Sequence, residues 1–470
     1  MSTKQLADFI DDTEIQESLL FAKHRQADRQ YVEELLAKAR MAKGLSHREA
    51  AVLLHMQEQD LWEEAFLAAK EVKEKIYGKR IVLFAPLYVS DYCVNNCEYC
   101  GYKHTNDSFR RRRLTMEEVA SEVEVLESLG HKRLVIEAGE DPVNCPIDYI
   151  LDVIRTIYSV KVDNGSIRRV NVNIAATTEE NYRKLQEAQI GTYILFQETY
   201  HRQTYAKRHP NGPKHDYDWH TTAQDRAMKA GIDDVGLGVL YGLYDFRYDT
   251  IAMLMHAEHL DQELGVGPHT ISVPRLRKAE NVDPSHYEQL VSDEDFKKIV
   301  AVLRLAVPYT GMILSTREDP VFRDQVLALG ISQISAGSCT GVGGYVDEHR
   351  LGQGGTPQFQ VGDHRSPLEI IKSLAKGGYI PSYCTACYRE GRTGDRFMQL
   401  AKSGQIQNVC QPNAILTFKE YQIDYGDEEL KELGDALLSQ HVNEIPKEPA
   451  RRITLNRLER IMQGERDLRF

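Results

Sequence analysis

The sequence has little cysteine, no long hydrophobic run and no excess of positive charge. Eight cysteines in 470 residues are too few for the disulfide framework of a small secreted protein, and we see no signal peptide. A run of about 18 apolar residues, the length that spans a bilayer, is absent from the sequence. A formal net charge of −12 disfavours broad nucleic-acid binding, which needs a basic surface. We therefore expect a cytoplasmic protein with no membrane or nucleic-acid partner.

Three of the few cysteines, Cys93, Cys97 and Cys100, lie close together directly after an apolar, strand-like run. A cubane 4Fe-4S cluster has one iron more than this group has thiols, so one iron would stay open to bind a small molecule. Zinc is an alternative, with His104 as a fourth ligand. A disulfide framework is a second alternative, although reducing cytosol would keep the thiols free.

From residue 80 onward the chain has the rhythm of a parallel α/β fold, because short β-branched runs alternate with amphipathic helical stretches. Thr115 and Ser292 are each expected to begin a helix, and residues 216–229 to form another. Eight such units predict a (β/α)8 TIM barrel, with active-site residues at the carboxyl ends of its strands. The predicted strands are 81–89, 133–138, 170–175, 192–197, 235–240, 270–274, 312–316 and 331–336.

Three parts of the chain are expected. Residues 1–79 are rich in helix-forming residues and predict a helical extension on the outside of the barrel. Residues 80–379 form the barrel, ending in a helix at 367–376, and residues 380–470 form a mostly helical segment. Glycine-rich stretches at 337–344 and 352–355 are too long for an ordinary connection, so we expect a functional or mobile loop there.

A second group of three cysteines, Cys384, Cys387 and Cys410, lies in the tail beyond the predicted barrel. A zinc ribbon or ordinary buried thiols are the alternatives to a second iron-sulfur cluster. The two remaining cysteines, Cys145 and Cys339, are interpreted as packed thiols.

The first triad resembles the signature of the radical S-adenosylmethionine (SAM) superfamily. The resemblance implies that the open iron of a 4Fe-4S cluster chelates SAM, whose cleavage yields a 5′-deoxyadenosyl radical that takes hydrogen from the substrate. It also implies that Tyr99 lies near the adenine. Glu140, in the step that matches the superfamily's Gly-Gly-Glu position, is expected to receive the SAM amino group, with Glu137 as a rival. Gln197 and Glu198, which leave the fourth strand, are expected at the SAM ribose or carboxylate.

Together, the two triads resemble those of the radical SAM tyrosine lyases that mature FeFe-hydrogenase. Stretches 137–142, 195–200, 268–275 and 314–318 also resemble that family. The resemblance implies cleavage of L-tyrosine at its Cα–Cβ bond, after hydrogen abstraction from the amino group, to p-cresol and dehydroglycine. Dehydroglycine would then yield carbon monoxide and cyanide. Cys384, Cys387 and Cys410 would hold the auxiliary cluster, whose extra iron collects both molecules as a precursor of the hydrogenase active site.

Arg317, at the end of the seventh predicted strand, is the best candidate to bind the substrate carboxylate, because a guanidinium pairs with a carboxylate in bidentate geometry. Ser315 lies two residues earlier on the same strand face and is expected to assist. Arg275 ends the sixth strand and is a second candidate. An arginine at a strand end also pairs with a structural carboxylate in many barrels, and that alternative stays open.

His269 precedes the sixth predicted strand, which places it at the opposite, lower mouth of the barrel. If the tail closes that mouth, His269 is positioned to bind the extra iron through an imidazole nitrogen. His259, on the preceding helix, is a rival. For either histidine, an ordinary hydrogen-bonded role is an equal alternative.

The competing functions are the related tyrosine lyase of thiamine thiazole synthesis, expected to lack this tail triad, and a non-catalytic scaffold that delivers iron. The family resemblance further implies an electron donor such as ferredoxin or flavodoxin, and other hydrogenase maturation proteins as partners.

Overall fold

The computed structural model describes residues 6–279, 282–351 and 357–470. Residues 352–355, part of the predicted glycine-rich loop, lie outside this range. Within it, no helix is long and apolar enough to cross a membrane.

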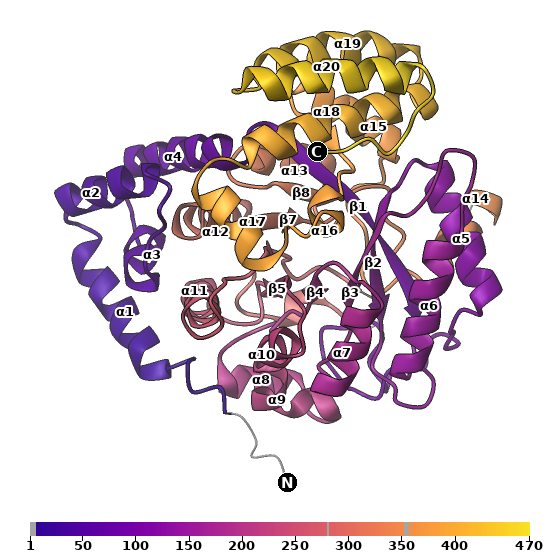
Figure 1. Ribbon diagram of the computed structural model, residues 1–470. Helices are drawn as coiled ribbons and strands as arrows, with labels where there is room; N and C mark the ends of the chain where they lie inside the picture. Colours follow the sequence, from indigo (N-terminus) through magenta and orange to yellow (C-terminus); the bar gives the residue numbers. More distant parts are fainter. Residues whose placement is uncertain (1–5, 280–281, 352–356) are drawn as a thin grey trace.

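The centre of the molecule is a closed barrel of parallel strands, as predicted (Figure 1). Each strand pairs with the next along the chain, and the first also pairs with the second and the eighth, which closes the ring. Several strands are shorter than predicted. Their bounds are β1 Arg80–Ser90, β2 Arg133–Ala138, β3 Arg169–Asn173, β4 Tyr193–Ile194, β5 Val235–Gly238, β6 Thr270–Ser272, β7 Gly311–Leu314 and β8 Gln333–Ser335.

A ninth strand, β9 (Ile380–Ser382), begins the tail, which is otherwise helical and was predicted to be mostly helical. Val82 of β1 is paired with Gln333 of β8 on one edge and with Ser382 of β9 on the other. One edge of β1 is therefore shared by two strands. Its lower part pairs with β9, and its upper part, from Ala85 onward, pairs with β2. The tail therefore enters the sheet at the lower mouth of the barrel.

Helices cover the outside of the barrel, and their starts follow local sequence signals. Thr115 and Ser366 each form a capping box with a glutamate three residues later, and Ser292 caps a helix through its side chain. The predicted helix at 216–229 is two helices, and part of the first glycine-rich stretch begins a helix. The covering helices are α5 Met116–Ser128, α6 Ile147–Ser159, α7 Glu179–Glu187, α8 Arg202–Arg208, α9 Tyr217–Thr221, α10 Ala223–Lys229, α11 Phe246–Leu264, α12 Asp293–Ala306, α13 Pro320–Leu327, α14 Gly344–Leu351 and α15 Pro367–Lys376.

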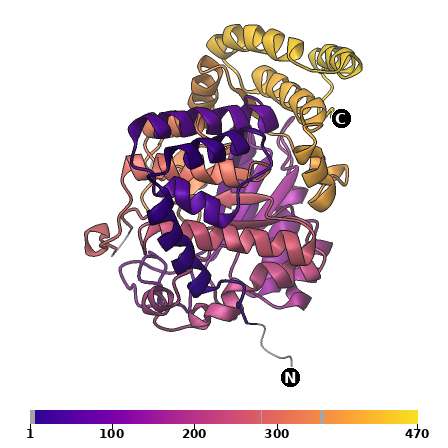
Figure 2. The ribbon, with the colours of Figure 1, turned by 90° about the vertical axis from the view of Figure 1, so that its left-hand side faces the viewer.

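The N-terminal extension packs on the outside of the barrel, as predicted, against α11 and α12 (Figure 2). It consists of α1 Asp12–Arg25, α2 Arg29–Arg40, α3 His47–Leu54 and α4 Gln59–Tyr77. The C-terminal helices lie at the end of the barrel where β9 joins it (Figure 1). They are α16 Ala386–Arg389, α17 Gly394–Lys402, α18 Gln407–Asp424, α19 Glu428–Asn443 and α20 Glu448–Met462.

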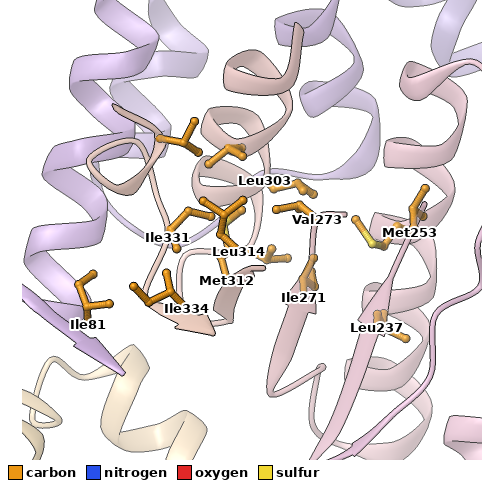
Figure 3. Packing of buried hydrophobic residues seen from close by; sticks show 14 of the residues in the cluster. Ile81, Leu237, Met253, Ile271, Val273, Leu303, Met312, Leu314, Ile331 and Ile334 are labelled. Carbon is orange, nitrogen blue, oxygen red and sulfur yellow. The ribbon is translucent and has the colours of Figure 1, made fainter. Parts of the chain in front are cut away.

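Most of the hydrophobic core lies between the strands and their covering helices. Ile271, Met312 and Ile334 point outward from β6, β7 and β8 into this layer (Figure 3). A second, small cluster lies inside the barrel and consists of Phe84, Val135, Ile194 and Ile313. We call these four residues the inner apolar layer. Because successive strand residues face opposite sides, the outer and inner clusters alternate along the strands.

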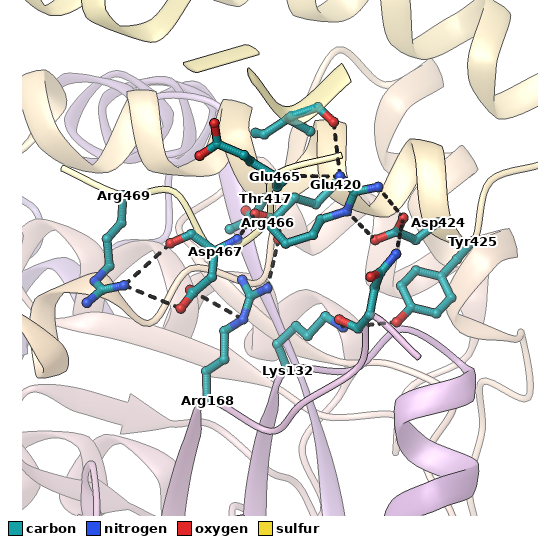
Figure 4. Close-up of polar contacts among 12 residues, drawn as sticks. Lys132, Arg168, Thr417, Glu420, Asp424, Tyr425, Glu465, Arg466, Asp467 and Arg469 are labelled. Carbon is teal, nitrogen blue, oxygen red and sulfur yellow. Dashed lines mark hydrogen bonds and ion pairs between the residues drawn. The ribbon is translucent and has the colours of Figure 1, made fainter. Parts of the chain in front are cut away.

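A network of charges fastens the end of the chain to the barrel (Figure 4). The buried Arg168, just before β3, pairs with Glu420 of α18 at 2.9 Å and with Asp467 at 3.4 Å. Asp467 also pairs with Arg389 of α16 at 2.6 Å, next to the tail cysteines. The segment after α20 therefore links the barrel to the helix that carries Cys387.

Candidate functional site

A cavity of about 210 Å³ opens at the carboxyl ends of the strands. The inner apolar layer forms its floor, and the loop that follows β1 forms part of its wall. Most of the predicted upper-site residues line this cavity, namely Cys93, Cys97, Tyr99, Cys100, Glu140, Glu198, Ser315 and Arg317.

The three thiols of the β1 loop face a common space that suits a positively charged iron group. The backbone N–H of Tyr102 donates to Sγ of Cys100 at 3.4 Å, and the side-chain amide of Gln358 lies 3.8 Å from the same sulfur. Burial raises the pKa of the Cys100 thiol to about 11, so a thiolate there needs a cation beside it. Iron supplies that charge, and N–H groups directed at cluster sulfurs are usual in such sites.

Asn95 joins the cysteine loop to the end of β2. Its side-chain N–H donates to Oε2 of Glu140 at 2.6 Å, and its Oδ1 accepts from the backbone N–H of Lys214 at 2.9 Å. The approach is close, because a Cβ on Gly212 would lie 2.3 Å from that Oδ1, and one on Gly139 would lie 2.3 Å from the carbonyl oxygen of Tyr92. Only glycine permits this packing, which holds the cysteines and Glu140 on the same side of the cavity.

The other predicted SAM residues differ in their contacts. Tyr99 donates its hydroxyl hydrogen to Nε2 of His209 at 2.7 Å, and Glu198 accepts from Nζ of Lys214 at 2.8 Å. Gln197 is buried outside the cavity lining, where its amide donates to Thr221 at 2.8 Å. The structure thus brings Tyr99 and Glu198 to the cavity and leaves Gln197 in a hydrogen bond with α9.

Arg317 and Ser315 both line the cavity, and the guanidinium of Arg317 stacks on the ring of Phe359 at 3.4 Å. Within the described part of the chain, no carboxylate forms an ion pair with Arg317, and burial lowers the pKa of its guanidinium. Arg275 is elsewhere. It lies outside the cavity lining and pairs with Glu318 at 2.6 Å and with Asp293 at 2.5 Å. Arg275 thus has the structural role, pairing with a carboxylate, that was the alternative to substrate binding.

A second, smaller cavity of about 70 Å³ lies at the lower mouth of the barrel. Cys384, Cys387, Cys410 and His269 all line it, so the structure brings the tail triad and this histidine together. Sγ of Cys387 lies 4.0 Å from Sγ of Cys410, and the N–H of Ala386 donates to Sγ of Cys384 at 3.4 Å. Burial raises the pKa of Cys384 to about 11, as in the upper triad.

The imidazole of His269 is arranged as in many metal-binding histidines. Its Nδ1 lies 3.3 Å from the buried carboxylate of Asp234, and burial lowers the pKa of the ring, so it is neutral at pH 7. A carboxylate on one ring nitrogen directs the lone pair of the other toward a metal. His259 does not reach this cavity, because its Nε2 pairs with Asp225 at 2.9 Å and its ring stacks on Phe9 at 3.8 Å.

A zinc site at either triad would need a set of ligands that converge on one ion. Zinc takes thiolates at about 2.3 Å, which requires all ligands to converge on one point. Among residues 6–279, 282–351 and 357–470, no three His, Cys, Asp or Glu side chains are arranged to hold a single ion. His104 is exposed, with its Nδ1 3.2 Å from the carbonyl oxygen of Cys93.

The inner apolar layer separates the two cavities, and no described residue lines both. On β1, Val82 lines the lower cavity and Phe84 the upper one; on β2, Arg133 and Val135 are divided in the same way. Inward-facing neighbours on one strand lie about 7 Å apart. The wall between the two cavities is therefore one layer of side chains thick.

Several residues at both cavities were missed by sequence reasoning. In the upper cavity these are Asn95, Asn173 and Lys214, and in the lower one the buried Arg80 and Arg133 and the half-buried Tyr388. The position of Arg80 and Arg133 at the start of two barrel strands was a usable signal, because strand starts meet at the lower mouth. Lys214 lies in the short 3-10 helix Pro213–His215, whose approach to the cavity no local pattern indicates.

Comparison with known proteins agrees with this geometry. Residues 87–257 match the Radical SAM superfamily, and residues 272–380 match the Biotin and Thiamin Synthesis associated domain. The 2-iminoacetate synthase of Salmonella typhimurium is 30% identical over 73% of this chain and 88% of its own length. A crystal structure of HydG, described as a maturase of the FeFe-hydrogenase, is 64% identical, with a TM-score of 0.95 over 99% of this chain and 100% of that one.

The chain belongs to the HydG family of radical SAM proteins. HydG from Carboxydothermus hydrogenoformans, described as an FeFe-hydrogenase maturase, is 39% identical, with a TM-score of 0.82 over 96% of this chain and 99% of that one. Both HydG likenesses include the tail that carries the second triad. As a member of this family the chain uses SAM, a 4Fe-4S cluster and a second, C-terminal cluster.

Proposed function

We propose that the protein is a radical SAM L-tyrosine lyase that produces p-cresol and dehydroglycine, converts the latter to carbon monoxide and cyanide, and builds an iron complex of these for FeFe-hydrogenase. The observation that carries the proposal is the pair of cysteine triads at opposite mouths of one barrel. One mouth suits cleavage of the substrate, and the other suits assembly on iron.

In this proposal Cys93, Cys97 and Cys100 hold the SAM cluster. When bound, the cluster and SAM supply a 5′-deoxyadenosyl radical for hydrogen abstraction. Glu140, held by Asn95, accepts the SAM ammonium, while Tyr99 and Glu198 contact the rest of the nucleoside. Gln197 acts on this site through α9, with which it is hydrogen bonded, and not through direct contact.

Arg317 binds the carboxylate of tyrosine, assisted by the hydroxyl of Ser315. Among the described residues the half-buried guanidinium of Arg317 has no ion-pair partner, and it favours an anionic ligand because partial burial without a counter-charge is costly. The cavity floor is the inner apolar layer, which excludes water from the cleavage site.

At the lower mouth, Cys384, Cys387 and Cys410 hold the auxiliary cluster, and His269 binds the extra iron, the substrate on which the two diatomic molecules are collected. Arg80 and Arg133 offset the negative charge of the thiolates.

The division into an extension (1–79), a barrel (80–379) and an auxiliary-cluster segment (380–470) belongs to the same proposal. So do a cytoplasmic location, a ferredoxin or flavodoxin as electron donor, and further maturation proteins as acceptors of the product.

The test is anaerobic reconstitution with iron and sulfide, followed by addition of SAM, tyrosine and a reductant. We expect p-cresol together with iron-bound carbon monoxide and cyanide, detected by chromatography and infrared spectroscopy. A Cys384→Ala variant should still form p-cresol but no iron-bound diatomic molecules, while a Cys145→Ala control keeps both activities. Formation of p-cresol without either diatomic molecule in the wild type would favour the 2-iminoacetate synthase activity, and no turnover with both clusters loaded would favour an iron scaffold.

A further inference from the structure

A polar level lies directly above the inner apolar layer in the upper cavity. Glu137 and Ser315 each follow a member of that layer by two residues, Val135 on β2 and Ile313 on β7, so both face inward one step higher. Asn173 of β3 is paired in register with Glu137 and donates its amide N–H to Oε2 of Glu137 at 2.9 Å. Ser272 and Ser335 also line the cavity, at the level of the inner apolar layer itself, so Glu137 is a deep charged group of the cavity but not its deepest polar one.

Three carboxyl groups line the cavity, and two of them already have assigned partners. Glu140 is held by Asn95 at the cysteine loop, and Glu198 is paired with Lys214. Glu137 is the deepest of the three and has a neutral amide as its hydrogen-bond donor. Glu137 on β2 and Arg317 after β7 face the same cavity, with β8 and β1 between their strands, and the two charges interact. An α-amino acid whose carboxylate is held by Arg317 would therefore direct its amino group toward Glu137.

We propose that Glu137 is a catalytic base of this site, which takes one proton from the ammonium group of the substrate amino acid. The step converts R–NH3⁺ and the Glu137 carboxylate into R–NH2 and the carboxylic acid, with no electron transferred. It rests on the proposed function, because abstraction of hydrogen from nitrogen requires the neutral amine. Nothing in the sequence alone separates Glu137 from Glu140 for this role, since the two lie three residues apart.

The charges around Glu137 suit a proton acceptor. Burial raises the pKa of its carboxyl to about 8, while Asn173 and Arg317 lower it and Glu198 raises it. Tyr88 of β1 also faces this group, and burial raises the pKa of its phenol well above the usual range, so it is neutral. An α-amino group titrates near about 8 in peptides, and the carboxylate of a free amino acid raises that value. Pairing of the substrate carboxylate with Arg317 offsets this effect, so the bound amine and Glu137 have comparable proton affinities.

The sign of the proton change follows from these affinities. At pH 7 a carboxyl with a pKa of about 8 is mostly protonated in the free enzyme, and free tyrosine carries an ammonium group. In the complex the carboxyl and the amine share a single proton, so the carboxyl proton is released to the solvent when tyrosine binds. Binding of tyrosine should therefore release up to about one proton in the wild type. Without the carboxyl, tyrosine should bind as the ammonium ion and release almost none.

The experiment measures tyrosine binding to the reconstituted enzyme with SAM and no reductant, by calorimetry at pH 7 in two buffers of different ionisation enthalpy. Proton release should be clearly measurable in the wild type, fall to near zero in Glu137→Gln and persist in Glu137→Asp. Glu122→Gln is the matched control, because Glu122 is a buried glutamate of α5 outside the cavity whose pKa is also raised by burial. It should release as many protons as the wild type.

Turnover gives a second readout. Glu137→Gln should lower p-cresol formation at pH 7 by about 100-fold, and the residual rate should rise with pH as free tyrosine loses its own proton. Equal proton release in wild type and Glu137→Gln, or a loss of rate that is the same at every pH, would overturn the assignment. If the wild type binds tyrosine with proton release but makes no p-cresol, the proposed function fails and the base assignment does not.

Discussion

Ser382 of β9 lies opposite Val82 of β1 in a parallel pairing at the lower end of the barrel. Cys384 follows two residues later, so this short strand carries the tail cysteines to the mouth that His269 borders. The same β1 ends at the upper mouth in the loop that holds Cys93. One strand therefore sets the positions of both triads.

Replacement of His269 by Asn should remove the extra iron and leave the cluster of the three tail cysteines in place. The reason is that His269 lines the lower cavity as a neutral imidazole beside Asp234, whereas the thiols bind the cluster. Iron content and electron paramagnetic resonance of the reconstituted protein measure the change. His259→Asn is the control, because His259 pairs with Asp225 away from the cavity. Full retention of iron by His269→Asn would remove this residue from the site.

Replacement of Arg317 by Lys should raise the KM for tyrosine about 10- to 100-fold, because a lysine cannot form the bidentate pair with a carboxylate and loses about 1.5–3 kcal/mol. The affinity for SAM should change little. Arg275→Lys is the comparison, since Arg275 pairs with Glu318 and Asp293 outside the cavity. Arg275→Lys should lower the Tm without raising the KM for tyrosine. If Arg275→Lys raised the KM and Arg317→Lys only lowered the Tm, the roles of the two arginines would be exchanged.

Replacement of Val135 by Phe should thicken the wall between the cavities. Val135 belongs to the inner apolar layer, which is one side chain thick, so added volume there obstructs small molecules that pass from the upper to the lower cavity. We expect p-cresol formation to continue while iron-bound carbon monoxide falls several-fold, as measured by infrared spectroscopy. Val143→Phe, the same change at an 80% exposed valine, should alter neither product. An equal loss of both products would show that the wall does not control transfer.

Replacement of Glu420 by Ala should destabilise the protein by about 1–3 kcal/mol, because it removes the closer of the two carboxylates that pair with the buried Arg168 side chain, at 2.9 Å, and leaves only Asp467 at 3.4 Å. The tail should loosen, so the auxiliary cluster is lost at a lower temperature than the SAM cluster. Thermal unfolding followed by circular dichroism and by cluster absorbance measures both effects. Glu465→Ala removes an exposed partner of Arg460 and should leave the Tm unchanged. Equal Tm values for the two variants would mean that this network does not stabilise the tail.

Local patterns predicted much of the fold and both triads. The barrel follows from the regular alternation of apolar runs and capped helices, since hydrogen bonding within each helix and burial of each strand are decided over a few residues. The capping boxes at Thr115 and Ser366 began helices where expected. Helix 216–229 was predicted as one element, but the chain breaks at Thr222, whose side chain bonds to the carbonyl oxygen of Asp218.

The sequence by itself determined that this protein has a parallel α/β barrel and two groups of three thiols, because residue type and spacing carry that information. Only the tertiary structure decided that Arg275 pairs with Glu318 while Arg317 faces the cavity, and that His269 meets the tail cysteines while His259 meets Asp225. The physical reason is that these choices depend on which strand neighbours which, and on the layer in the barrel that each side chain faces. Such contacts join residues far apart in the chain, so no local pattern specifies them.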